Sequence, residues 1–169
     1  MKMGIVITFT ALLGIGVVFL MNVQSDSSDS GLILTYEAVQ NIPFGSVHWH
    51  PHITININGE VVPIPSEIGI TIGRTADTQL SGMRMSPTHT HESDGTIHLE
   101  NLNPRSKPET LTLGYFFYVW GKDFNSTCIF DYCTNNGTLT MYINGEMNTE
   151  FQHYMMHDKD EIVINYRTK

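Results

Sequence analysis

Residues 52–64 read HITININGEVVPI and carry the strongest fold signal in the chain. Three isoleucines alternate with polar residues from His52 to Ile57, which is typical of a strand with one buried face. Asn58-Gly59 follows, and this pair between alternating apolar runs is the best short signal for a tight β-hairpin. The stretch therefore predicts a hairpin at the start of the domain.

Further strands are predicted by the same signals. Turn residues separate short alternating or apolar runs along the rest of the chain. The predicted strands are Ile68–Ile72, Thr88–His91 paired with Thr96–Glu100 around Ser93-Asp94-Gly95, Thr138–Ile143 ending at Asn144-Gly145, and the terminal strand Glu161–Tyr166. A sheet made largely of hairpins is the expected result.

One helix is predicted, over residues 110–121. Its apolar residues recur at the helical spacing and form a stripe for the core, namely Leu113, Phe116, Phe117 and Trp120. Thr112 can cap its start and Gly121 can end it.

Hairpins packed on one amphipathic helix predict an α+β fold with a mainly antiparallel or mixed sheet. The element order over residues 110–166 resembles the close of a β-grasp (ubiquitin-like) domain. A β-sandwich is the alternative.

The N-terminus predicts export. Lys2 precedes an uncharged apolar run, Met3 to Val23, and about 20 such residues span a bilayer. We expect residues 1–24 to be a signal anchor or transmembrane helix, residues 25–30 a polar linker, and residues 31–169 one extracytoplasmic, His-rich β domain. Cleavage near Ser25, giving a secreted protein, is the alternative.

The charge composition limits the classes of binding partner that we expect. The 169 residues carry a net charge of −8 and only nine Lys and Arg. Neutralising phosphates requires many more cationic side chains, so nucleic acid is not an expected partner. The expected partners are metal cations and, through the N-terminal segment, the membrane.

Two further marks agree with export. Asn125 and Asn136 each begin an N-glycosylation sequon. Cys128 and Cys133 are the only cysteines, and in an oxidising compartment they are expected to form one disulfide.

The histidines predict a metal site. A four-residue loop, Glu92 to Gly95, would place His89 opposite His98, with His91 and Glu100 on the same face. Three imidazoles suit Zn²⁺ or Cu²⁺, and Glu100 can be a fourth ligand, an orienting group or a base. We expect one divalent metal per domain. A loop one residue longer or shorter would send the two strands' histidines to opposite faces.

A second source of ligands is HWHPH. Alternation places His48, His50 and His52 on one side of an edge strand that Pro51 interrupts. A solvated polar face is the alternative. Methionines near histidines, such as Met155 and Met156, favour copper if they are ligands, although methionine more commonly fills core gaps.

Three longer runs resemble an uncharacterised family of small exported proteins of ammonia-oxidising archaea, with looser bacterial relatives. They are HWHPHITININGEVVPIP (48–65), HTHESDGTIHLE (89–100) and LTLGYFFYVWGK (111–122). The resemblance covers about residues 48–166 and implies an exported, membrane-tethered location among organisms that rely on copper outside the membrane. It implies no particular activity.

Three functions remain open. The first is a membrane-anchored protein that binds, delivers or stores Zn or Cu through His89, His91 and His98. The second is a zinc enzyme that uses a metal-bound water on a small substrate such as CO₂. The third is a cell-surface structural or interaction module without metal.

Overall fold

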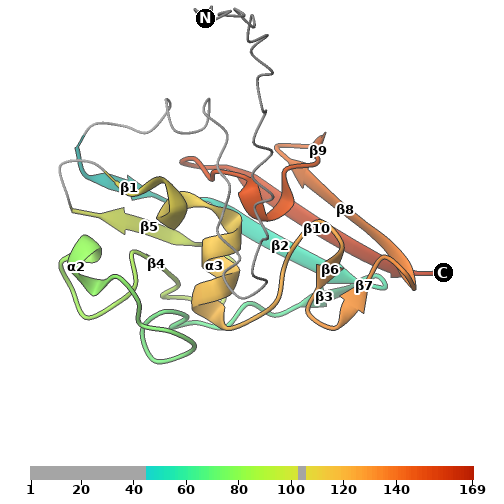
Figure 1. Cartoon of the computed structure of the whole chain (residues 1–169), viewed down its shortest axis with the longest axis horizontal. Coiled ribbons are helices and arrows are strands. Elements are labelled where there is room, and N and C mark those ends of the chain that lie inside the picture. Colours follow the sequence, from blue (N-terminus) through green and yellow to red (C-terminus); the bar gives the residue numbers. More distant parts are fainter. Residues whose placement is uncertain (1–44, 103–105) are drawn as a thin grey trace, which may run out of the picture. The chain divides into compact units, whose positions relative to one another are not determined.

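The computed structural model describes residues 45–102 and 106–169. Its largest element is a five-stranded mixed sheet in the order β3-β2-β10-β8-β9 (Figure 1). The strands are β2 His52–Ile57, β3 Glu60–Val62, β8 Gly137–Ile143, β9 Glu146–Asn148 and β10 Glu161–Thr168. The first of these strands, β2, and the last, β10, are parallel neighbours, and a hairpin lies on either side of the pair.

Both Asn-Gly turns are hairpin turns, as predicted. Asn58 and Gly59 have φ of 56° and 91°, and Asn144 and Gly145 have φ of 53° and 86°. Two successive positive φ angles define the turn whose twist matches that of the flanking strands. Asparagine and glycine adopt this backbone at lower cost than other residues, so local chemistry sets both hairpins.

The sheet has one buried and one open face. The apolar residues at alternate positions of its three long strands are buried, and these are Ile53, Ile55 and Ile57, Leu139, Met141 and Ile143, and Ile162, Ile164 and Tyr166. The helix α3 (Leu113–Trp120) contributes Leu113, Phe116, Phe117 and Trp120 to the same core. The predicted helical stripe is therefore confirmed as core, and the fold is α+β with mixed and antiparallel sheets.

The helix starts slightly later than predicted. Residues Pro108–Leu111 form a 3₁₀ turn (η1), and Thr112 then caps α3 by accepting a hydrogen bond from the amide of Tyr115 at 3.2 Å. Gly121, at φ 74°, ends the helix. The predicted cap and end are both confirmed.

A second, three-stranded sheet has the order β1-β5-β4. Its strands are β1 Val47–Trp49, β4 Thr88–His89 and β5 His98–Asn101. The predicted pairing of His89 with His98 is confirmed, but β4 is shorter than expected. Thr96 bridges His52 instead of His91, because β2 competes for this edge.

The predicted strand Ile68–Ile72 is wrong. The carbonyl of Glu67 accepts hydrogen bonds from the amides of residues 70, 71 and 72, which closes a turn. Glu67 and Gly69 have positive φ, and only an isolated bridge joins Ile68 to Ile72. A four-residue helix, α2 (Thr78–Ser81), follows.

The remaining elements are small. The strands β6 (Cys128–Ile129) and β7 (Tyr132–Cys133) form a ribbon whose ends the predicted Cys128–Cys133 disulfide joins. A 3₁₀ turn, η2, covers Phe151–His153. The predicted anchor, residues 1–24, and linker, residues 25–30, lie outside the described residues. Within the described ranges, no helix has the length and apolar composition for a bilayer crossing.

Candidate metal centre

One face of the three-stranded sheet carries the candidate ligands. Cross-strand pairing sets His48 beside Glu100 and His89 beside His98. Paired residues project to the same side of a sheet, so the pairing brings three strands' polar side chains together. Leu99, between His98 and Glu100, points the other way and is fully buried.

A first set of ligands consists of His89, His91, His98 and Glu100. One donor atom from each lies within 4.8 Å of the other three. Nε2 of His89 is 3.2 Å from Nε2 of His91, and Oε1 of Glu100 is 3.4 Å from Nδ1 of His98 and 3.9 Å from Nε2 of His89. Bonds of about 2.0–2.1 Å to a tetrahedral ion set its ligand atoms roughly 3.3 Å apart, so these spacings fit one metal.

A hydrogen bond to the backbone orients the ring of His89. Its side chain is fully buried, and its Nδ1 lies 2.8 Å from the carbonyl oxygen of Ser86. Because a carbonyl only accepts, Nδ1 carries the proton and Nε2 presents a lone pair to the cluster. Burial lowers the pKa of His89 to about 4, although the Ser86 hydrogen bond and the Glu100 charge oppose this. The imidazole is therefore neutral at pH 7, which is the form that binds a metal.

His98 presents an unsatisfied nitrogen. Nδ1 is buried and faces Oε1 of Glu100 at 3.4 Å, but among the described residues no well-formed hydrogen bond satisfies it. Burial lowers the pKa of His98, and the charges of His91 and His50 lower it further, although Glu100 opposes this. Buried polar atoms are rarely left without a partner, and a metal ion is a partner that this donor set can hold.

The three histidines of HWHPH do not act together: two lie in the cluster and the third lies outside it. His48, His50 and His98 form a second set of three whose donor atoms lie within 4.8 Å of one another. His52 is turned elsewhere, with Nε2 2.8 Å from the carbonyl oxygen of Asp94 and Nδ1 3.2 Å from Oε2 of Glu161. The three do not share a face, because β1 ends at Trp49 and the chain changes sheets at Pro51.

The late histidine–methionine run lies apart from this cluster. Met155 and Met156 are buried in the hydrophobic core. The ring of His157 packs against Trp49, and its Nδ1 lies 3.5 Å from Oδ2 of Asp160. The methionines therefore fill the core, which is the more common role of methionine, and they are not ligands of this cluster.

Two aspartates that we did not predict support this region. Oδ1 of Asp158 accepts a hydrogen bond from the amide of His50 at 3.0 Å and lies 3.9 Å from that ring's Nδ1. Asp160 is buried and accepts hydrogen bonds from the hydroxyl of Tyr154 at 2.6 Å and the amide of His157 at 2.7 Å. In the sequence, both aspartates closely follow His157 in a short polar turn. This is the only sequence signal that points to their contacts.

Asp160 predicts a pH-dependent stability. Burial raises its pKa, but hydrogen bonds from His157, Tyr154 and Asn144 outweigh burial and lower the pKa from 3.8 to about 2. Since the folded pKa is below the unfolded value, the stabilisation is complete above pH 4 and is lost as the pH falls toward 2. It amounts to about 2 kcal/mol.

Asp160→Asn should therefore lower the free energy of unfolding by about 2 kcal/mol at pH 7, and the deficit should shrink from pH 4 downward. Urea unfolding from pH 7 to pH 3 measures this, with the exposed Asp131→Asn as control. A deficit that stays constant down to pH 3 would contradict the assignment.

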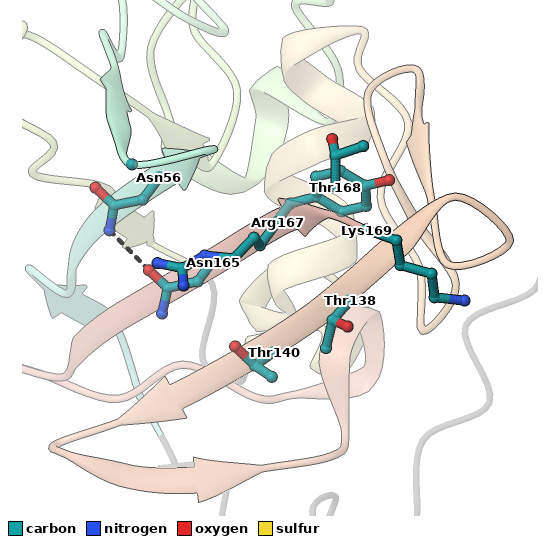
Figure 2. Close-up of a pocket in the computed structure, with 9 residues that line it drawn as sticks. Asn56, Thr138, Thr140, Asn165, Arg167, Thr168 and Lys169 are labelled. Atoms are coloured by element: carbon teal, nitrogen blue, oxygen red, sulfur yellow. Dashed lines mark hydrogen bonds between the residues drawn. The ribbon is translucent and has the colours of Figure 1, made fainter.

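A separate hollow of about 620 Å³ lies on the open face of the five-stranded sheet. Most residues that line it have polar side chains, and none of them belongs to the histidine cluster (Figure 2). The Nδ2 of Asn56 donates to Oδ1 of Asn165 across neighbouring strands at 2.9 Å.

No protein-family model, curated protein or solved structure matches this chain. The function is therefore inferred from the geometry of the histidine cluster.

Proposed function

We propose that the protein is an extracytoplasmic metal-binding protein in which His89, His91, His98 and Glu100 hold a divalent ion. One observation carries this proposal: four donor atoms from two strands and a loop lie within 4.8 Å of one another. The buried His89, oriented by Ser86, supplies the fixed side of the site.

The donor set favours Zn²⁺ or Cu²⁺. Imidazole nitrogens and a carboxylate oxygen suit these borderline ions, whereas Cu⁺ prefers thiolate and thioether sulfur. Both cysteines are joined in the disulfide, and Met155 and Met156 lie in the core.

The site fits binding and delivery better than catalysis. Four protein ligands complete a tetrahedral ion, whereas a catalytic zinc keeps one position open. His91 is exposed and His89 is buried, so an ion can enter and leave on the His91 side.

We also propose that this domain is exported, anchored through residues 3–23 or secreted after cleavage near Ser25. The apolar run and the disulfide support this, because disulfides persist in oxidising compartments. Asn125 and Asn136 are the candidate glycosylation sites.

A β-grasp-like arrangement is our proposal for the fold. The parallel β2–β10 pair between two outer hairpins, with α3 in the same core, supports it. A high-resolution experimental structure would test the assignment.

The test of metal binding is elemental analysis of the full chain, purified in mild detergent without an affinity tag. After exposure to micromolar zinc and removal of free ions, we expect the wild type to retain at least one tightly held equivalent. His89→Ala/His91→Ala should lose it, and His153→Ala, outside the cluster, should retain it. A wild type without metal above the buffer level would overturn the proposal.

A further inference from the structure

We propose that the cluster holds two metal ions, the second bound by His48 and His50 and sharing His98 with the first. This inference rests on the proposed function, because it adds a second ion beside the first.

The number of donors exceeds what one ion needs. Six side chains gather on this face, whereas a tetrahedral ion takes four. His48 and His50 remain outside the first set, yet their donor atoms and one of His98 lie within 4.8 Å of one another. This second set has the three imidazoles that a Zn²⁺ or Cu²⁺ site requires.

His98 lies between the two sets. Its ring centroid is 4.6 Å from that of His91 on one side and 4.7 Å from that of His50 on the other. An imidazole has two nitrogens on different edges of the ring, so one ring can be a ligand of both ions when each nitrogen faces one of them.

His50 is positioned as a ligand by its neighbours. The carboxylate of Asp158 is held by the His50 amide at 3.0 Å and faces the Nδ1 side of the same ring at 3.9 Å. At 3.9 Å the carboxylate does not hydrogen-bond the ring, but it places a negative charge beside Nδ1 and leaves Nε2 as the more open nitrogen for a metal.

Glu100 offsets the repulsion between two cations. Its Oε1 lies 3.3 Å from Nε2 of His48, 3.4 Å from Nδ1 of His98 and 3.9 Å from Nε2 of His89. One carboxylate therefore contacts ligands of both positions.

The two positions differ in exposure. The side chain of His89 is fully buried, whereas those of His48 and His50 are 66% and 40% exposed. The inner ion is therefore the one retained, and the outer ion exchanges with solvent. We expect the second dissociation constant to be at least about tenfold the first, since water screens the outer position.

The experiment is a Cu²⁺ titration of the full chain, followed by native mass spectrometry and electron paramagnetic resonance. The wild type should bind two copper ions, and the integrated signal should fall as the second enters, because a shared imidazole couples the two spins. His48→Ala/His50→Ala should bind one copper ion with full signal. His52→Ala, which changes the third histidine of the same motif, should behave as wild type.

The outcomes separate the two proposals. One copper ion in the wild type, lost in His89→Ala/His91→Ala, overturns the second position and leaves the proposed function standing. Two ions in both the wild type and His48→Ala/His50→Ala, or two ions without loss of signal, also overturn the shared site. A wild type that binds no copper overturns both proposals.

Discussion

The variant His89→Ala should lose most of the stabilisation that zinc gives the wild type. His89 is the fully buried member of the site, and its Nε2 is held toward the other ligands by the Ser86 hydrogen bond. With free zinc at about a hundred times the dissociation constant, the wild type should gain about 2.7 kcal/mol in its free energy of unfolding. The variant should gain close to nothing, because zinc affinity should fall at least about a hundredfold.

The measured quantity is the difference between urea unfolding with zinc and with chelator. Alanine at this position also creates a cavity and leaves the Ser86 carbonyl without its donor, which costs about 1–3 kcal/mol in the metal-free protein. Comparing zinc with chelator within each variant removes that contribution. His91→Ala, at an exposed position, should show the same loss of zinc response while folding normally. A full zinc response in both variants would contradict the site.

Gly73→Ala should destabilise the fold by about 3 kcal/mol. Gly73 has φ of 75°, and a Cβ there would lie far inside van der Waals contact with the carbonyl oxygen of Val119, near the end of α3. That oxygen already accepts a hydrogen bond from the amide of Arg74 at 2.7 Å. Since the obstacle is backbone, the loop must move and the hydrogen bond must lengthen.

Gly59→Ala is the matched control. Gly59 also has positive φ, 91°, but a Cβ added there would meet no heavy atom within 4 Å. Only the backbone strain of an L-residue should appear at this turn, about 1 kcal/mol. Urea unfolding of the two variants distinguishes the steric effect of the Val119 carbonyl from backbone strain alone. Equal losses in the free energy of unfolding would show that the Val119 contact does not matter.

Local sequence patterns predicted much of the fold. The alternation from His52 to Ile57, the Asn58-Gly59 turn and the Thr112 cap each depend on neighbours within a few residues. The prediction for Ile68–Ile72 was wrong because a Glu67 carbonyl that collects three amides is a turn, and an apolar run does not distinguish a strand from a turn packed on the core.

The part of the candidate site that comes from the β4–β5 hairpin was predictable from the sequence. His89 pairs with His98 because both belong to consecutive strands, and Glu100 follows His98 by two residues on the same face. The place of His48 was not predictable, since it comes from the pairing of β1 with β5, about fifty residues away. Neither was the turn of His52 toward Asp94 and Glu161.

Short-range chemistry in the chain therefore specified the hairpin turns, the buried face of each strand, the helix ends and the disulfide partner. Long-range contacts decided the parallel pairing of β2 with β10, the division of HWHPH between two sheets, and the meeting of six donor side chains on one face. The reason is physical: turn and cap energies depend on adjacent residues, whereas strand pairing across about a hundred residues is selected by burial of the whole core.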